Sequence, residues 1–344
     1  MVELTPLPLV LMANAAVGKR WANLAAEILS GVAGGLICLL GAADLAGAKV
    51  LTPAANSDFQ LALDATVMAT GLAAAAIASH PVRKRVGQVL PIDPDSPVHA
   101  LALALTVILL GVDLAVIAFT DVLATAQSQP PLTIADLIFD ETPFLVFALV
   151  GVGLFVRREL PDTARRLGLV LPTWWQIAIA LAAAGVFFVF VQQVDMVSHA
   201  WTPGIAHRVD AATNHLFGQL SWPGGALAVA LIPGLCEEVL FRGALQPRIG
   251  LLATALLFTS IHTQYALSFQ TLAVFVSAIG LGLIRKYTNT TASATCHAGY
   301  NLLAGIGLGG LLLYGAVVVE LGLIAAAAYG LWTSRRRAAA AGSP

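Results

Sequence analysis

Apolar segments long enough to cross a lipid bilayer recur along almost the whole chain. A transmembrane helix needs about 20 consecutive, predominantly apolar residues. The candidate segments lie near residues 23–46, 59–79, 98–120, 142–156, 174–194, 223–246, 250–267, 269–285, 291–309 and 311–333. The pattern predicts an all-α protein, a polytopic transmembrane helix bundle of about ten spans. The expected number of spans is eight to ten, because the junctions at 246–250 and 267–269 are short.

The composition supports a membrane protein and argues against several other classes. Of 344 residues, 58% are hydrophobic and 11% are charged, whereas a soluble protein needs a larger charged share on its surface. The net charge of −1 gives no sign of a surface for nucleic acid. We therefore expect a multi-pass protein of the cell membrane that contacts the lipid bilayer and binds no nucleic acid. Its Ala-rich segments and short loops are typical of a prokaryotic plasma membrane protein.

The distribution of Lys and Arg predicts the orientation of the bundle. If the N-terminus is cytoplasmic, 15 of the 18 basic residues fall on the cytoplasmic side. The remaining three are Lys49 and Arg208 outside, and Arg242 within the membrane. Because basic loops stay preferentially on the cytoplasmic side, both termini are predicted to be cytoplasmic.

A polar segment divides the helices into two groups. Residues 157–172 contain two Arg pairs and two prolines, a composition typical of an interfacial linker. The predicted organisation is an N-terminal transmembrane extension of about four helices at 1–156, the linker at 157–172, a second domain at 173–333 and a basic cytoplasmic tail at 334–344. In the first group we interpret four acidic residues as helix-end or interhelical polar contacts: Glu27, Asp44, Asp64 and Asp113.

The second group carries ionisable residues inside its apolar segments, beginning with Glu237, Glu238 and Arg242. Side chains four residues apart share a helix face, so Glu238 and Arg242 are placed for an ion pair, while Glu237 points about 100° away. A charged side chain at membrane depth costs at least a few kcal/mol. A second carboxylate therefore indicates chemistry; the alternative is a buried ion pair that only holds helices together.

Two further polar signatures follow along the chain. Phe258 and His262 lie one helical turn apart on one face, as do His297 and Asn301. An imidazole and a carboxamide on one face suit donation of hydrogen bonds to a developing oxyanion. Each signature also fits a polar contact between helices. Taken together, the three place Glu, His, His and Asn on separate helices that are able to face one cavity.

In this order and at this spacing, the chain resembles the CPBP family. The matching motifs are Glu-Glu-x-x-x-Arg at 237–242, Phe-x-x-x-His at 258–262 and His-x-x-x-Asn at 297–301. That family contains the CAAX prenyl endopeptidases of the Rce1 type and the bacteriocin-processing and immunity proteins also called Abi. The resemblance covers about residues 165–333, so 173–333 is interpreted as the protease domain and the first helices are an extension.

The resemblance implies an intramembrane endopeptidase whose site opens toward the cytoplasm. By position, Glu237 is similar to the general base that activates water, assisted by His262, and His297 and Asn301 to the groups that bind the oxyanion. Three other residues are similar to the supporting structure of the site: Glu238, Arg242 and Phe258.

The resemblance leaves the cofactor and the substrate open. Glu237, His262 and His297 would suffice as a catalytic zinc set with water in the fourth position, but the same residues can work without metal, and no cofactor is the favoured prediction. The expected substrate is a peptide or membrane-protein segment, with or without a lipid group. The alternative function is a non-proteolytic membrane protein, either a proton-coupled transporter or an immunity or binding partner.

Overall fold

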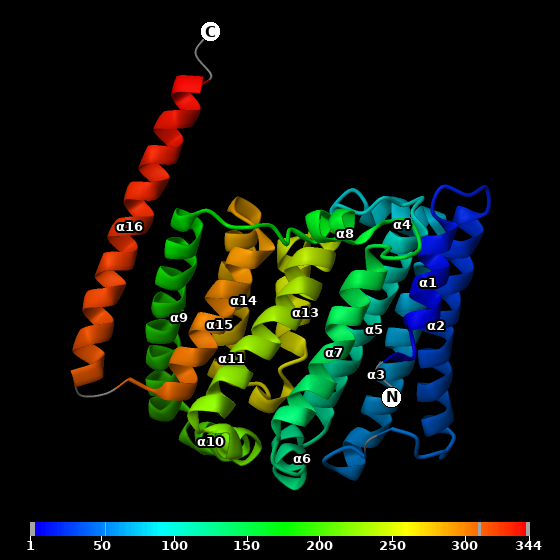
Figure 1. Cartoon of the computed structure of the whole chain (residues 1–344). Coiled ribbons are helices and arrows are strands. Elements are labelled where there is room, and N and C mark those ends of the chain that lie inside the picture. Colours follow the sequence, from blue (N-terminus) through cyan, green and yellow to red (C-terminus); the bar gives the residue numbers. More distant parts are fainter. Residues whose placement is uncertain (1–3, 52, 309–310, 342–344) are drawn as a thin grey trace.

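The chain folds as a bundle of helices that run roughly side by side (Figure 1). This computed structural model describes residues 4–51, 53–308 and 311–341, and no strand lies within these ranges. The α-helices are α1 (Leu7–Ala16), α2 (Ala22–Leu45), α3 (Ser57–Ala76), α4 (His80–Val86), α5 (Pro97–Phe119), α6 (Val122–Ser128), α7 (Ile134–Gly151), α8 (Leu160–Leu167), α9 (Trp174–Trp201), α10 (Pro203–Phe217), α11 (Pro223–Glu238), α12 (Gln246–Ile249), α13 (Leu251–Ser260), α14 (Phe269–Tyr287), α15 (Thr290–Ile306) and α16 (Leu311–Ala341). The 3₁₀ turns η2 (Gly218–Leu220) and η4 (Thr263–Tyr265) and the π-helical segment η3 (Val239–Leu245) complete the described elements.

Seven helical segments are long and apolar enough to cross a membrane, within the described ranges. They are α2, α3, α5, α9, the continuous run Pro223–Ile249, α14 and most of α16. The polytopic helical bundle predicted from the sequence is therefore confirmed. The protein is a multi-pass membrane protein.

The other three predicted spans correspond to helices with specific departures from the apolar pattern. The segment near 142–156 belongs to α7, whose 18 residues include Asp136, Asp140 and Glu141. The segment near 291–309 is α15, with 17 residues. The prediction of a continuous helix over 250–267 is wrong, because α13 ends at Ser260 after 10 residues and an irregular turn follows.

The basic residues gather at one end of the bundle. In Figure 1, α4 and α8 lie at the same end, and they carry Arg83–Arg85 and Arg165–Arg166, whereas α10 with Arg208 lies at the opposite end. This separation agrees with the predicted charge asymmetry. The assignment of the basic end to the cytoplasm remains a prediction from the positive-inside rule.

In the N-terminal group, glycines allow α2 and α3 to approach closely. A Cβ atom at Gly71 would lie 2.1 Å from the backbone nitrogen of Cys38, and one at Gly34 would lie 2.2 Å from that of Ala75. Small residues give this kind of close contact in membranes, where van der Waals packing drives helix association. The short helix α1, not predicted as a membrane element, buries Val10 and Ala13 in the same group.

Two of the four acids of this group, Asp44 and Asp113, make the predicted helix-end or interhelical contacts, and Asp64 bonds within its own helix α3. Asp44, at the end of α2, accepts a hydrogen bond from the backbone NH of Leu51 at 3.1 Å. Asp64 accepts one from Gln60 at 2.8 Å. Asp113 accepts one from Ser260 of α13 at 2.8 Å, which joins the two groups of helices.

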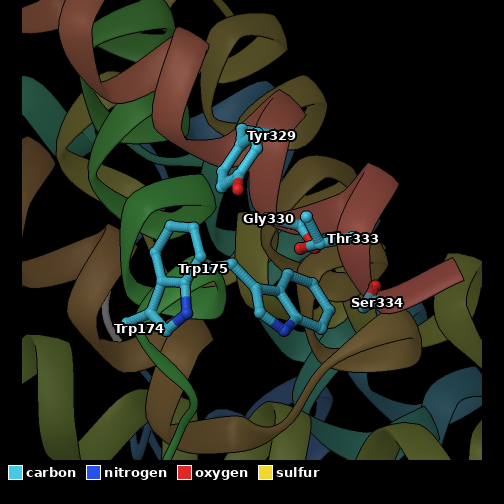
Figure 2. Close-up of a pocket in the computed structure, with 6 residues that line it drawn as sticks. All are labelled: Trp174, Trp175, Tyr329, Gly330, Thr333 and Ser334. Carbon is cyan, nitrogen blue, oxygen red and sulfur yellow. The ribbon is translucent and has the colours of Figure 1, made fainter. Parts of the chain in front are cut away.

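The last helix packs on the first span of the second group. Trp174 and Trp175 of α9 face Tyr329, Thr333 and Ser334 of α16 around a pocket of about 340 Å³ (Figure 2). A Cβ atom at Gly330 would lie 2.2 Å from the Cβ of Trp175, so only glycine fits this contact. Helix α16 continues to Ala341, so the described part of the predicted tail, 334–341, is helical.

Two close contacts position the helices that carry the polar motifs. A Cβ atom at Gly234 of α11 would lie 3.0 Å from the backbone nitrogen of Ala298, so α11 and α15 approach each other closely. Beyond Glu238, α11 changes to the π-helical segment η3, a rare geometry that is frequent at functional sites. Arg242 and Gln246 then donate hydrogen bonds to the Ala278 and Gly282 carbonyls of α14, at 3.2 and 2.8 Å.

Candidate active site

The centre of the site is a fully buried ion pair. Arg242 Nη1 lies 3.0 Å from Glu238 Oε1, and the two side chains are 1% and 0% exposed. They are four residues apart, as the sequence pattern predicts. Ser293 of α15 also donates a hydrogen bond to Glu238 Oε2, at 2.5 Å. The carboxylate of Glu238 is therefore held by groups from two helices.

His297 lies between the two glutamates of the first motif. Its Nδ1 is 3.2 Å from Glu238 Oε1, and its Nε2 is 3.8 Å from Glu237 Oε2. An ionised carboxylate only accepts hydrogen bonds, so Nδ1 carries a hydrogen and donates a hydrogen bond to Glu238. The second ring nitrogen is thereby directed toward Glu237.

Glu237 has a different environment from its neighbour. Its side chain is 8% exposed, and its Oε2 accepts no hydrogen bond from the described residues. Glu141, buried on α7, adds a second negative charge whose field acts on Glu237. One glutamate of the motif is thus fixed in an ion pair, while an oxygen of the other remains available for chemistry.

Phe258 is the common neighbour of the motif side chains. The guanidinium of Arg242 lies over its ring at 4.2 Å from the centroid, a cation–π contact. The ring centroids of His262 and His297 lie 4.7 and 5.9 Å from that of Phe258. The predicted supporting residue therefore connects all three motifs through its ring.

The end of α13 fixes the tautomer of His262. Its Nδ1 lies 2.8 Å from the Phe258 carbonyl oxygen, and a carbonyl can only accept, so Nδ1 is the protonated nitrogen. Nε2 of the neutral ring is then an acceptor. The ring stacks on Tyr265, with centroids 6.3 Å apart and planes 5° apart.

Asn301, the last of the predicted site residues, bonds to the backbone of α11. Its Nδ2 donates a hydrogen bond to the Val229 carbonyl of α11 at 3.3 Å. A carboxamide nitrogen carries two hydrogens, so one remains for another acceptor. Asn301 also lies one helical turn from His297, on the same face of α15.

The three predicted zinc ligands do not fit one ion in this arrangement. Donor atoms that share a zinc ion lie about 2.0–2.2 Å from it and hence close to one another. Within the described residues, the donors that all lie within 4.8 Å of one another belong to His199, His207 and Asp210, at the α9–α10 corner. Glu237, His262 and His297 do not form such a group, so we derive no catalytic step through zinc.

The sequence reasoning missed three contributors to the site. Ser293 precedes His297 by four residues, so the helical spacing already placed it on the motif face. Tyr265 follows His262 in the turn after α13. Glu141 gave only a weak signal, an acidic residue at the edge of an apolar segment. Its approach to Glu237 depends on the packing of α7 against α11.

Comparison with known proteins places this site in a family. Residues 219–303, which contain all three motifs, match the family model for type II CAAX prenyl endopeptidase Rce1-like proteins. The chain is also 30% identical over 158 residues to the uncharacterized protein YpbD of Bacillus subtilis. That alignment covers 44% of this chain and 78% of YpbD. No solved structure matches the chain.

Proposed function

The chain belongs to the Rce1-like CAAX prenyl endopeptidase family, and we propose that it hydrolyses peptide bonds near the cytoplasmic face of the membrane by a water that Glu237 activates. Family membership makes it a membrane protease that acts on a peptide. The base, the groups that bind the oxyanion and the position of the cut are the proposal. The free carboxylate oxygen of Glu237 beside His297 is the observation that carries it.

The first step assigns the proton acceptor. Glu237 takes a proton from water as the water oxygen attacks the peptide carbonyl carbon. His262 presents Nε2 as an acceptor because its Nδ1 hydrogen is held by the Phe258 carbonyl. It accepts a hydrogen bond from the same water and orients it.

The second step stabilises the charge on the substrate oxygen. A protonated His297 donates through Nε2 while Nδ1 remains bound to Glu238. The free hydrogen of Asn301 Nδ2 is the second donor. The proton held by Glu237 then passes to the leaving amine, and the products are a carboxylic acid and an amine.

The proposed substrate is a peptide segment at the membrane surface, with or without a lipid group. We place the enzyme in a prokaryotic plasma membrane, with the site open on the side where the basic residues gather. The side follows from the charge asymmetry of the loops, and the kind of membrane from the Ala-rich segments and short loops.

The decisive experiment compares two substitutions that change the same functional group. Glu237→Gln keeps the shape of the side chain and removes the base, so cleavage of a lipid-anchored fluorogenic peptide library should fall about 10²- to 10⁴-fold. Glu27→Gln is the matched control, because Glu27 is an exposed glutamate on α2. It should retain wild-type cleavage, and both variants should purify as folded protein.

Chelation is a second arm of the same experiment. Cleavage should persist after exhaustive treatment with a metal chelator, and elemental analysis should find well below one zinc per chain. Loss of activity with chelator and recovery with zinc would replace the glutamate mechanism by a metal mechanism. Equal cleavage by Glu237→Gln and wild type would reject the assignment. Glu237-dependent proton movement in vesicles without cleavage would favour the transporter instead.

A further inference from the structure

A large apolar cavity lies between the N-terminal helices and the protease helices. Its volume is about 520 Å³, within the roughly 300–1,000 Å³ typical of small-molecule sites. One wall comes from α1, α5 and α7, including Leu101 and Phe147. The opposite wall comes from η3, α12 and α13, including Leu240 and Leu257. The proposed reaction uses none of these residues.

One end of the cavity carries a buried cation. Arg248 of α12 lines the cavity and is 4% exposed. Its guanidinium donates to the Ala244 carbonyl and to the Gly151 carbonyl, the latter at 3.4 Å. Its Nε makes no hydrogen bond with the described residues. The guanidinium is thus held by neutral oxygens only and keeps one donor for an incoming anion.

Three further arginines surround this end. Arg157 Nε donates to Asn14 Oδ1 at 2.8 Å, and Asn14 also lines the cavity. Burial, together with the positive charges of Arg158 and Arg166, lowers the pKa of Arg157 to about 10. None of these arginines, Arg248 included, forms a salt bridge with the described residues. Their mutual repulsion would be relieved by an anion.

The depth of the cavity matches one leaflet of a bilayer. Its lining residues on α5 extend from Val98 to Val112, which at the helical rise spans about 21 Å. One leaflet of a typical bilayer, with its headgroup region, is about 20–22 Å thick. The cationic end lies at the end of α7, because Arg248 contacts Gly151, and α8 lies at the same end of the bundle (Figure 1). An acyl chain whose headgroup sits at that surface would reach the far end of the cavity.

From the cavity and the arginines together, we propose that this site binds one anionic phospholipid of the cytoplasmic leaflet. One acyl chain fills the cavity, and the phosphate accepts hydrogen bonds from Arg248 and Arg157. Planar guanidinium groups suit this recognition because they donate two parallel hydrogen bonds to phosphate oxygens. The lipid would hold the N-terminal extension against the protease domain, which assigns a role to these helices that is independent of the proposed reaction.

The site also borders the candidate active site. Phe144 of α7 lines the cavity and packs against Phe241, with centroids 5.9 Å apart. Phe241 in turn packs against Phe258 at 5.2 Å. A filled cavity would therefore support the wall on which the motif rings rest.

The test measures lipid binding by the full chain in a neutral detergent after removal of native lipid. Palmitoyl-oleoyl-phosphatidylglycerol is compared with the zwitterionic phosphatidylcholine of the same chains and with inorganic phosphate. Retained lipid is counted by native mass spectrometry, and the thermal unfolding midpoint is recorded with each addition. The wild type should retain one phosphatidylglycerol and unfold at a higher temperature with it than with either other addition.

Two variants separate the headgroup contact from the chain contact. Arg248→Gln should weaken phosphatidylglycerol binding about ten- to a hundredfold, because a hydrogen bond to a charged group is lost. Ala102→Phe fills the cavity from α5 and should abolish retention while every arginine remains. Arg85→Gln removes an exposed arginine of α4 that does not line the cavity, and it should bind like the wild type.

Each alternative outcome rejects the proposal. Equal effects of the two lipids would mean that the cavity takes any acyl chain without reading the headgroup. An equal effect of inorganic phosphate would mean that the arginines bind a free anion. Unchanged retention in Ala102→Phe would place the lipid elsewhere. If Arg248→Gln does not fold, Arg157→Gln tests the same headgroup contact.

Discussion

Replacing Arg242 by methionine should be one of the most damaging single substitutions in the second group of helices. The change keeps an unbranched side chain but leaves the carboxylate of Glu238, which is 0% exposed, without its cation. It also removes the contact over Phe258 at 4.2 Å and the hydrogen bond to Ala278. Glu238 would then rely on Ser293 and His297 alone.

The size of the effect follows from the burial of both partners. Breaking a buried ion pair by removing one partner costs about 3–5 kcal/mol, and a desolvated cation–π contact adds up to about 2 kcal/mol. Folded proteins are typically stable by about 5–15 kcal/mol in total. Arg242→Met should therefore lose a large part of the protein's stability. Removing both charges leaves no buried charge without a partner. The double variant Arg242→Met with Glu238→Gln should lose less than the sum of the single variants, by about 2 kcal/mol or more.

The assay is equilibrium unfolding of the purified protein in mixed micelles, followed by the far-ultraviolet circular dichroism of the helices. Arg208→Met is the control, because Arg208 pairs with Asp121 while the two side chains remain 50% and 43% exposed. Such exposed pairs contribute about 1 kcal/mol or less. Equal losses for Arg242→Met and Arg208→Met, or strict additivity in the double variant, would refute the reasoning.

Three further predictions concern the architecture. Reporters fused after Arg85 and after Arg166 should both report the cytoplasm, and an external signal at either would show that the span order is wrong. Gly71→Leu should lower the yield of folded protein in a detergent extract, because a Cβ at this position already lies 2.1 Å from the backbone of α2; a normal yield would contradict that packing. A hydrogen bond from a backbone NH at the start of α6 holds the pKa of Asp121 below its usual range, and Arg208 lowers this pKa further. The N-terminal cap that the Asp121 carboxylate gives α6 is therefore intact at neutral pH and is lost as the pH falls through this lowered pKa. Hydrogen exchange in α6, corrected for intrinsic rates, should rise only in acid. Asp121→Ala should remove this pH dependence.

The sequence predicted the bundle well because a bilayer imposes its own length on the helices. An apolar run of about 20 residues has few other stable conformations in lipid. The prediction failed over 250–267, where α13 stops at Ser260. The turn is stabilised by contacts that hydropathy does not record, including the stacking of His262 on Tyr265. Helix α1 was missed for the opposite reason, since its 10 residues are too short for a spanning window.

The contacts of the candidate site that lie within one helix could be predicted from the sequence. The spacing of Glu238 and Arg242 predicted their contact, and the structure has them 3.0 Å apart. The position of His297 between the two glutamates could not be read from spacing, because it depends on how closely α11 approaches α15. The same is true of Glu141, which reaches the site from the N-terminal extension. The catalytic roles themselves remain the proposal that the substitutions above would test.

The ring of Phe258 has a consequence for how this site can evolve. Because Arg242, His262 and His297 all lie against one aromatic ring, a smaller residue at 258 would loosen three contacts in a single step. A larger residue would displace all three side chains at once, and no single neighbouring substitution would restore their positions. Substitutions at these four positions should therefore be accepted only in combination. Laboratory selection for a new substrate should leave them untouched and accumulate changes in the surrounding walls.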